Sequence, residues 1–255
     1  MWAHINHLWR WCGTAFSFFV FGLGGLLIPL VAVPILYCLP GSSERRQQRG
    51  QCLIHYVFRF YIGLMKCIGV LSYEVEGVEK LRSAKLIVAN HPSLIDVIFL
   101  IALTPNANCV VKGKLAANPF TRGPIKTAGY IINRESEKVI QAADSAFSRG
   151  DALIVFPEGT RSIPGEKLQF KRGAANIAIR AGVDLTPVLI RCNPTTLTKA
   201  DRWYQVPKSK VHMHLRVNDP VAVEPYLREN SPSIAARKLT ADLVNYFEKE
   251  LVNYE

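Results

Sequence analysis

The pattern of apolar and polar positions divides the chain into two parts of different character. Thr14–Leu39 contains 26 residues without a charge, which exceeds the roughly 20 residues that a helix needs to cross the apolar core of a bilayer. Three glycines, together with Pro29 and Pro34, interrupt this run. The pattern therefore predicts a membrane segment, and it leaves open a kinked transmembrane helix and a re-entrant helical hairpin.

A second apolar segment, Leu53–Leu71, is amphipathic. His55, Arg59 and Lys66 would lie within about 40° of one another on a helix of 3.6 residues per turn. A basic stripe on an otherwise apolar helix is typical of a helix that lies in the membrane interface, although a helix packed on a folded domain is the alternative. The basic cluster Glu44–Arg49 predicts that everything after it is cytoplasmic.

From Tyr73 onward, short apolar runs alternate with longer amphipathic segments. This alternation predicts an α/β fold, a mixed sheet flanked by helices. We therefore expect two parts, an N-terminal membrane anchor with its interfacial helix in residues 1–71 and an α/β domain in residues 72–255. The expected strands are Tyr73–Val78, Leu86–Asn90, Cys109–Lys112, Gly129–Asn133, Ala152–Phe156, Leu185–Arg191 and Val211–Val217, and the expected helices are Ile95–Leu103, Ser136–Arg149, Lys171–Ala181 and Ser233–Val252.

Composition narrows the classes of partner. The formal net charge of +11 over 255 residues favours anionic partners such as phosphates or anionic lipid. No zinc-finger, basic-zipper or RNA-binding pattern is present, so we expect no nucleic acid. The six cysteines are scattered without CxxC spacing, which is typical of small buried side chains in a reducing compartment and not of a disulfide framework or a zinc site.

The stretch from Ala89 to Asp96 carries the first candidate chemistry. His91 follows an apolar strand and precedes an apolar helix, so it lies in a strand-to-helix turn, where open α/β sheets bind their ligands. Asp96, five residues later, can reach back to the imidazole and orient it as a base. The alternative is that Ser93–Asp96 is only a helix-capping box.

The block Phe156–Ser162 also follows a strand. Gly159 permits a tight turn, Arg161 offers a planar fork for a phosphate, and Glu158 can accept a hydrogen bond from a hydroxyl. Taken alone, the block also fits an ordinary surface turn with a solvated charge.

Other strand ends carry weaker signals. Lys112 and Arg134 each end an apolar strand, and Pro187 lies within another, where a proline belongs at an edge, a bulge or the first residue. His212 and His214 alternate on a strand without a visible third ligand, so we expect a surface strand and no metal site.

The combination is more specific than its parts. Asn-His-x4-Asp from Asn90, Gly-x4-Arg from Gly129, Phe-Pro-Glu-Gly-Thr-Arg from Phe156 and the proline-containing strand occur in that order. In this order the motifs resemble the glycerolipid acyltransferase family, whose typical member is 1-acylglycerol-3-phosphate O-acyltransferase. The resemblance covers roughly Val75 to Val217.

The resemblance implies a role for each matching residue. His91 would be the general base that deprotonates the acceptor hydroxyl, and Asp96 would orient it. Arg134 and Arg161 would bind the acceptor phosphate with help from Lys112. Glu158, Gly159 and Thr160 complete the predicted substrate-binding residues, with Glu158 and Gly159 positioning the glycerol part.

The resemblance also implies the partners and the location. We expect a membrane-bound enzyme with its catalytic domain on the cytoplasmic face, in a bacterial inner membrane. Its acceptor would be a membrane lysophospholipid and its co-substrate acyl-CoA or acyl-carrier protein, without a cofactor or a metal ion. Pro92, Lys114 and Asn133 depart from the commonest family pattern, which leaves the acceptor open. The oligomeric state is open as well.

Three other functions remain to be weighed. The same chemistry could act on another acceptor, such as a different lysophospholipid, a lyso-ornithine lipid or a secondary-metabolite acyl product. A non-catalytic membrane protein that binds anionic lipid would also fit the charge. A serine hydrolase is disfavoured because the sequence has no Gly-x-Ser-x-Gly motif.

Overall fold

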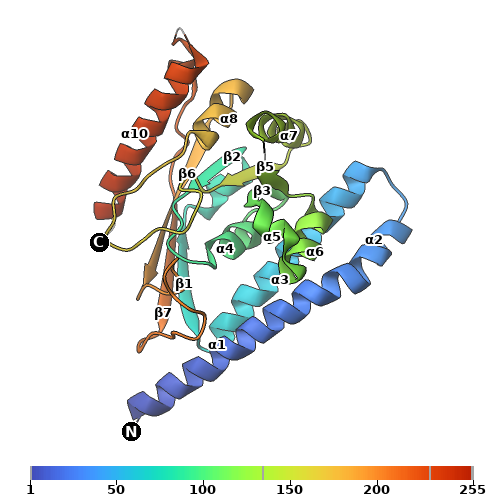
Figure 1. Ribbon diagram of the computed structural model, residues 1–255, viewed down its shortest axis with the longest axis vertical. Helices are drawn as coiled ribbons and strands as arrows, with labels where there is room; N and C mark the ends of the chain where they lie inside the picture. The colour runs from blue at the N-terminus through green and yellow to red at the C-terminus, as the bar shows by residue number, and fades with distance from the viewer. Residues whose placement is uncertain (1, 134, 230, 254–255) are drawn as a thin grey trace.

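A computed structural model describes residues 2–133, 135–229 and 231–253. The helices, one of them interrupted by a π-helical segment, and the strands alternate after the N-terminal region (Figure 1). The elements are α1 (Trp2–Leu27), the π-helical η1 (Ile28–Ala32), α2 (Val33–Cys38), α3 (Ser43–Cys67), β1 (Leu71–Glu76), the 3₁₀-helical η2 (Val78–Arg82), β2 (Leu86–Ala89), α4 (Asp96–Leu103), β3 (Ala107–Lys112), α5 (Gly113–Ala117), α6 (Pro119–Ala128), β4 (Ile131–Asn133), α7 (Ser136–Ser148), β5 (Ala152–Val155), α8 (Gly173–Ala181), β6 (Leu185–Asn193), β7 (Val211–Val217), α9 (Glu224–Leu227) and α10 (Pro232–Val252).

The strands form one sheet in the order β1-β7-β6-β2-β5-β3-β4. Every neighbouring pair is parallel except β6 and β7, which are antiparallel. The predicted mixed sheet flanked by helices is therefore confirmed. Because β2, β3 and β5 run in the same direction, their carboxyl ends meet at one edge of the sheet, where the candidate residues follow each strand.

Alternate strand residues feed two separate apolar layers. In β2, Ile87 and Ala89 belong to the layer formed with α3 and α4, whereas Leu86 and Val88 belong to the layer formed with α7, α8 and α10. Figure 1 shows these two groups of helices on opposite sides of the sheet. A strand that is buried on both faces needs apolar side chains at consecutive positions, which explains the unbroken Leu86–Ala89 run.

The N-terminal region is one long helical run, and the chain reverses only after this run has ended. The segments α1, η1 and α2 follow one another directly, and the run His4–Cys38 is long and apolar enough to cross a membrane. In η1 the Val33 N–H bonds to the carbonyl of Ile28, five residues back, next to Pro29, which has no N–H. The hairpin considered within the apolar run is therefore wrong, because the chain reverses only between α2 and α3 (Figure 1).

Helix α3 packs on the sheet side of this run through Ile54, Ile62 and Met65, which are buried. His55, predicted as part of a basic stripe, is also buried, and its Nδ1 lies 2.9 Å from the carbonyl oxygen of Ile101 in α4. Of the two alternatives for this segment, a helix in the membrane interface and a helix packed on the folded domain, the second therefore describes the face of α3 that carries His55.

The strands and helices predicted from Tyr73 onward are present, with ends within two residues of the predicted bounds, whereas the amphipathic segment predicted at Leu53–Leu71 is the longer helix α3, Ser43–Cys67. Pro187 lies where the pairing of β6 changes register. Val188 pairs with Val217, and Leu185 pairs with Val221. From one pair to the next, β6 advances by three residues and the opposite segment by four, so the extra residue makes a bulge. The predicted placement of Pro187 at an edge, a bulge or a strand start is thus confirmed.

Candidate active site

The imidazole of His91 and the carboxylate of Asp96 meet at the carboxyl end of β2. His91 Nδ1 lies 2.9 Å from Asp96 Oδ2, and the same oxygen accepts the backbone N–H of Ser93 at 2.7 Å. Because Oδ2 acts as an acceptor here, Nδ1 carries the hydrogen and Nε2 keeps its lone pair. The Ser93 contact is one half of a capping box, but the other half is missing, because the Ser93 hydroxyl donates to the Thr196 carbonyl and the N-cap of α4 is Ile95 without a side-chain hydrogen bond. The carboxylate of Asp96 therefore holds the imidazole and does not complete a capping box.

The surroundings of the pair are asymmetric. The Asp96 side chain is fully buried, whereas that of His91 is 16% exposed. Burial raises the pKa of Asp96, and the hydrogen bonds from His91 and Ser93 oppose that effect. The ring of Phe156 stacks on the His91 imidazole with centroids 4.2 Å apart. The imidazole is thus held from one face and one edge, and it remains partly accessible.

Glu158 fastens the His91 turn to the neighbouring strand end. Its Oε1 accepts the backbone N–H of His91 at 2.8 Å and the hydroxyl of Ser162 at 2.9 Å, while the Ser162 N–H donates to the His91 carbonyl at 2.7 Å. Burial raises the pKa of Glu158, and the hydrogen bonds from His91 and Ser162 oppose it. One oxygen of the carboxylate predicted to accept a substrate hydroxyl is therefore occupied by the protein itself.

The turn that follows Glu158 brings cations to the same edge. Gly159 adopts φ +66°, and a Cβ on it would lie 3.1 Å from Lys171 Nζ. Thr160 and Arg161 are half-buried, and Arg161 Nη1 donates to the carbonyl of Leu197 at 2.8 Å. A side chain at position 159 would thus compete with Lys171 for space beside Arg161.

Lys112, at the end of β3, completes a group of cations. Partial burial lowers the pKa of Lys112, and the charges of Lys171, Lys199, Arg161 and Lys114 lower it further. Among the residues that the structure describes, no carboxylate pairs with Lys112, Lys171 or Lys199. Unpaired cations this close to one another favour an anionic ligand. Arg134 lies outside the described residues.

An apolar cavity of about 260 Å³ adjoins the His91 turn. Leu94 and Ile95, which stand between His91 and Asp96 in the sequence, form part of its wall. The opposite wall comes from α1 through Phe18 and Phe21, and Leu197 closes it on the side of the loop between β6 and β7. The site therefore combines an oriented imidazole, a group of cations and an apolar cavity.

Comparisons with known proteins agree with this arrangement. The family model described as Acyltransferase matches residues 72–191. The 1-acyl-sn-glycerol-3-phosphate acyltransferase of Helicobacter pylori is 39% identical over 135 residues, covering 49% of this chain and 57% of that protein. A putative enzyme of the same name from Caenorhabditis elegans is 32% identical over 176 residues, covering 65% of this chain and 61% of that protein. Over residues 72–191 the chain is thus similar to the acyltransferase family.

The similarity in fold extends over nearly the whole chain. The crystal structure of the 1-acyl-sn-glycerophosphate acyltransferase from Thermotoga maritima matches with a TM-score of 0.71 at 21% identity, and the match covers 98% of this chain and 97% of that chain. The match to this structure shows the fold, while the family model and the curated relatives confirm the resemblance predicted from the order of the motifs. The chain spans about three-fifths of the length of the relatives from Helicobacter pylori and Caenorhabditis elegans.

Three residues of this candidate site were not predicted. Ser162 closes the block around Glu158, Phe156 stacks on His91, and the carbonyl of Leu197 receives Arg161. Ser162 and Phe156 belong to the predicted block Phe156–Ser162, so the sequence indicated that they lie at the site but not what each side chain contacts. Leu197 carried none, because a leucine in a loop is unremarkable and its contact here is made by the backbone.

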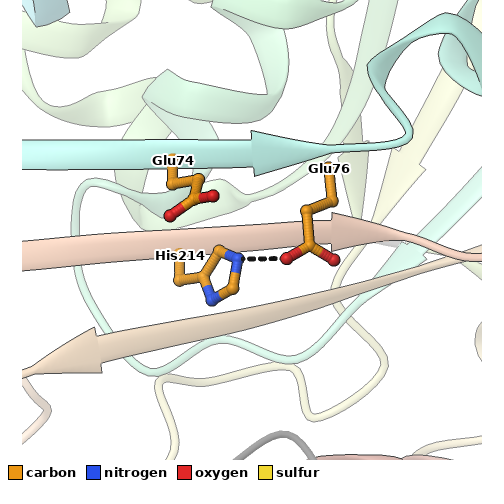
Figure 2. A group of neighbouring side chains, drawn as sticks. All are labelled: Glu74, Glu76 and His214. Atoms are coloured by element: carbon orange, nitrogen blue, oxygen red, sulfur yellow. Dashed lines mark hydrogen bonds and ion pairs between the residues drawn. The ribbon is translucent and has the colours of Figure 1, made fainter.

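A second group of polar side chains lies on the outer face of β1 and β7. His214 Nε2 is 2.9 Å from Glu76 Oε1, and Glu74 stands beside them (Figure 2). The ligand atoms of these three residues lie within 4.8 Å of one another, and two of the three come from β1, not from the strand that carries His212 and His214. The expectation of a surface strand without a metal site stays a prediction. Arg216 also binds Glu76 Oε2 at 2.6 Å, and its positive charge disfavours a metal ion there.

Proposed function

We propose that the chain transfers a fatty acyl group from an acyl thioester to the free hydroxyl of 1-acylglycerol-3-phosphate, forming phosphatidic acid. One observation carries this proposal: the His91–Asp96 pair adjoins both a group of unpaired cations and an apolar cavity. The cations suit the phosphate of the acceptor, and the cavity suits an acyl chain. The names of the relatives support the same substrate.

His91 acts as the general base. Its Nε2 removes the proton of the acceptor hydroxyl as that oxygen attacks the thioester carbonyl, while Asp96 stabilises the imidazolium that forms. The tetrahedral intermediate then collapses, the carbon–sulfur bond breaks, and the imidazolium returns the proton to the departing thiolate. One ester forms and one thioester is lost, without an acyl-enzyme.

The cations bind the phosphate of the acceptor, and a hydrogen bond within the protein fixes the position of Arg161. Arg161 presents a planar guanidinium whose one amino group is fixed by Leu197, and Lys112 adds a second charge from the neighbouring strand end. Because both stand at the carboxyl edge that also carries His91, a bound phosphate would leave the glycerol hydroxyl near Nε2. We include Arg134 in this group by its position after β4.

The donor is an acyl-CoA or an acyl-carrier protein, and no cofactor takes part. Its acyl chain enters the cavity between α1 and α4, where Phe18, Phe21 and Ile98 line the wall. Its phosphate-bearing part stays outside, near the exposed Lys114 and Lys199. This orientation presents the thioester carbonyl at the cavity mouth beside the His91 turn.

The chain works at a membrane, with residues 1–71 as the anchor and residues 72–255 as the catalytic domain on the cytoplasmic face. The exposed side of α1 carries Trp2, Trp9, Phe16 and Phe19, while Tyr56 and Phe60 are exposed on α3. Exposed aromatic and aliphatic side chains in this number are stabilised by lipid and not by water. Packing of α1 on the domain also lets the cavity open toward the bilayer that supplies the acceptor.

A panel of acceptors tests the proposed reaction. With one acyl-CoA, the purified protein is expected to acylate 1-acylglycerol-3-phosphate with the highest kcat/KM, ahead of lysophospholipids with larger headgroups and of 2-hydroxyl acceptors without phosphate. The cations supply the physical reason, since an acceptor without phosphate leaves them unpaired. Activity restricted to acceptors without a phosphate would overturn the assignment.

A pH profile tests the role of Lys112. Because its pKa is lowered, Lys112 loses its charge at a lower pH than an ordinary lysine. The affinity for the acceptor should therefore be full below that pKa and fall as the pH rises through it. Lys112→Arg keeps the charge, because the pKa of arginine is above about 12.

The KM for 1-acylglycerol-3-phosphate, measured against pH, is therefore expected to rise in the alkaline range in the wild type and to rise only at higher pH in Lys112→Arg. The KM for the acyl-CoA serves as the internal control. Identical acceptor profiles in the two proteins would remove Lys112 from the binding group.

A further inference from the structure

Leu197 lies at the junction of three parts of the site. Its carbonyl oxygen accepts two hydrogen bonds, from Arg161 Nη1 at 2.8 Å and from the backbone N–H of Leu94 at 3.1 Å. Leu94 belongs to the turn that carries His91. A single backbone atom therefore fixes both the guanidinium proposed to bind the acceptor phosphate and the turn that carries the base.

The side chain of Leu197 points to a different function from its carbonyl. It is partly buried against the apolar layer that includes α4, and it forms part of the wall of the cavity. The preceding residue is fixed as well, because the hydroxyl of Ser93 donates to the Thr196 carbonyl at 2.9 Å. The side chain of this one residue thus lines the cavity, while its carbonyl binds Arg161.

The backbone of Leu197 is held in an uncommon conformation. Its φ is +53°, in the left-handed region that a side chain as large as leucine rarely adopts. Such a conformation persists only where the surrounding contacts over-determine it. Packing of the side chain in the cavity wall is one of these contacts.

The loop that contains Leu197 is also tied to the N-terminal helix. Trp203 packs against Phe18 of α1 with ring centroids 5.7 Å apart, and the guanidinium of Arg10 binds the carbonyl of Lys208. The cavity therefore lies between α1 and this loop, and a chain that fills it contacts both. A change in cavity packing would act on Leu197 directly.

We propose that Leu197 is a positioning residue that couples the two substrates: an acyl chain in the cavity completes the packing of its side chain, and its carbonyl then holds Arg161 for the acceptor phosphate. This inference rests on the proposed function. Its consequence is that the affinity for the acceptor depends on how well the donor chain fills the cavity. Such coupling between two sites typically amounts to about 5-fold or more.

The test compares the acceptor KM measured with octanoyl-CoA and with palmitoyl-CoA, each at a saturating concentration. In the wild type the acceptor KM is expected to be about fivefold or more lower with palmitoyl-CoA. Leu197→Ala removes the side chain from the wall and keeps the carbonyl, and Leu197→Gly also frees the backbone. In both variants the ratio of the two KM values is expected to fall to about one.

Two further variants exclude a merely structural effect. Leu197→Met replaces the leucine by another apolar side chain of similar volume and is expected to keep the wild-type ratio. Leu115→Ala shortens a leucine in the wall of the same cavity without touching Arg161. It is expected to alter the KM of the acyl-CoA while keeping the ratio of the acceptor KM values.

The outcomes separate this inference from the function on which it rests. An active wild type whose acceptor KM is the same with both donors would overturn the coupling alone. So would an unchanged ratio in Leu197→Ala and Leu197→Gly, or an equal loss of the ratio in Leu115→Ala. A wild type without turnover on any acceptor would overturn the proposed function and this inference together.

Discussion

Replacing His91 by alanine is expected to lower kcat for acyl transfer by about 100- to 10,000-fold, the range that a positioned general base contributes. Asp96 Oδ2 lies 2.9 Å from Nδ1 of the His91 imidazole. Nε2 is therefore the ring nitrogen that would accept the proton of the acceptor hydroxyl. Its removal should leave the membrane segment and the cations in place, so that acceptor KM and membrane association stay near their wild-type values. The measurement is the initial rate of ester formation with acyl-CoA and 1-acylglycerol-3-phosphate.

His212→Ala is the matched control for this variant. His212 lies on the outer face of β7, where its Nδ1 is 3.0 Å from the hydroxyl of Ser72, and it contacts none of the proposed substrate groups. We expect its kcat to equal that of the wild type. A His91→Ala protein that keeps the wild-type rate would mean that another group takes the proton, or that the chain binds lipid without catalysis.

Arg161→Ala is expected to raise the KM for 1-acylglycerol-3-phosphate by about 10- to 100-fold. Hydrogen bonds to a charged group contribute about 1.5–3 kcal/mol, and each 1.4 kcal/mol corresponds to a factor of ten in affinity. The KM for acyl-CoA should change far less, because the acyl chain occupies the cavity beyond Leu94 and Leu197. Both constants come from one set of steady-state assays.

Two companion variants sharpen this prediction. Arg161→Lys keeps a positive charge but loses the planar fork, so it should recover part of the acceptor affinity. Arg180→Ala removes an arginine that pairs with Glu137 on the surface at 2.8 Å and should leave both KM values unchanged. An equal increase in the KM of donor and acceptor in Arg161→Ala would contradict a phosphate-binding role.

The contact between His91 and Asp96 was predictable because it is local. A strand followed by a turn and an apolar helix places a residue of the turn within reach of the first helical turn, and α4 does begin at Asp96. The gathering of separate blocks at one edge was also predictable, since parallel strands bring their carboxyl ends together. The order of the strands decides which blocks touch, and β2 lies beside β5.

The role of Glu158 was not predictable from the same pattern. Its carboxylate bonds to a backbone N–H that lies 67 residues earlier in the chain. A sequence shows which side chains can accept a hydrogen bond, but not which distant backbone group will donate it. The carbonyl of Leu197 illustrates the same limit. Each residue of the loop between β6 and β7 has a backbone carbonyl, and the sequence does not show which of them accepts the hydrogen bond from Arg161.

Helix α6 was missed because its residues are poor helix formers. Pro119, Gly123 and Pro124 lower helix propensity, yet all lie within it. Tertiary packing decides the matter, since a Cβ on Gly123 would lie 2.7 Å from Pro29 and a Cβ on Gly25 would lie 2.1 Å from the carbonyl oxygen of Phe120. These glycines permit α1 and α6 to approach closely, a function that local propensity does not report.

The central claim is tested most directly by identifying the product. Purified protein in phospholipid vesicles is supplied with isotopically labelled palmitoyl-CoA and 1-acylglycerol-3-phosphate, and the lipids and the protein are analysed by mass spectrometry. The account predicts labelled phosphatidic acid from the wild type, a trace at most from His91→Ala, and no label on the protein. Labelled phosphatidic acid from both proteins at equal rates, label bound covalently to the wild type, or no labelled phosphatidic acid from the wild type would contradict it.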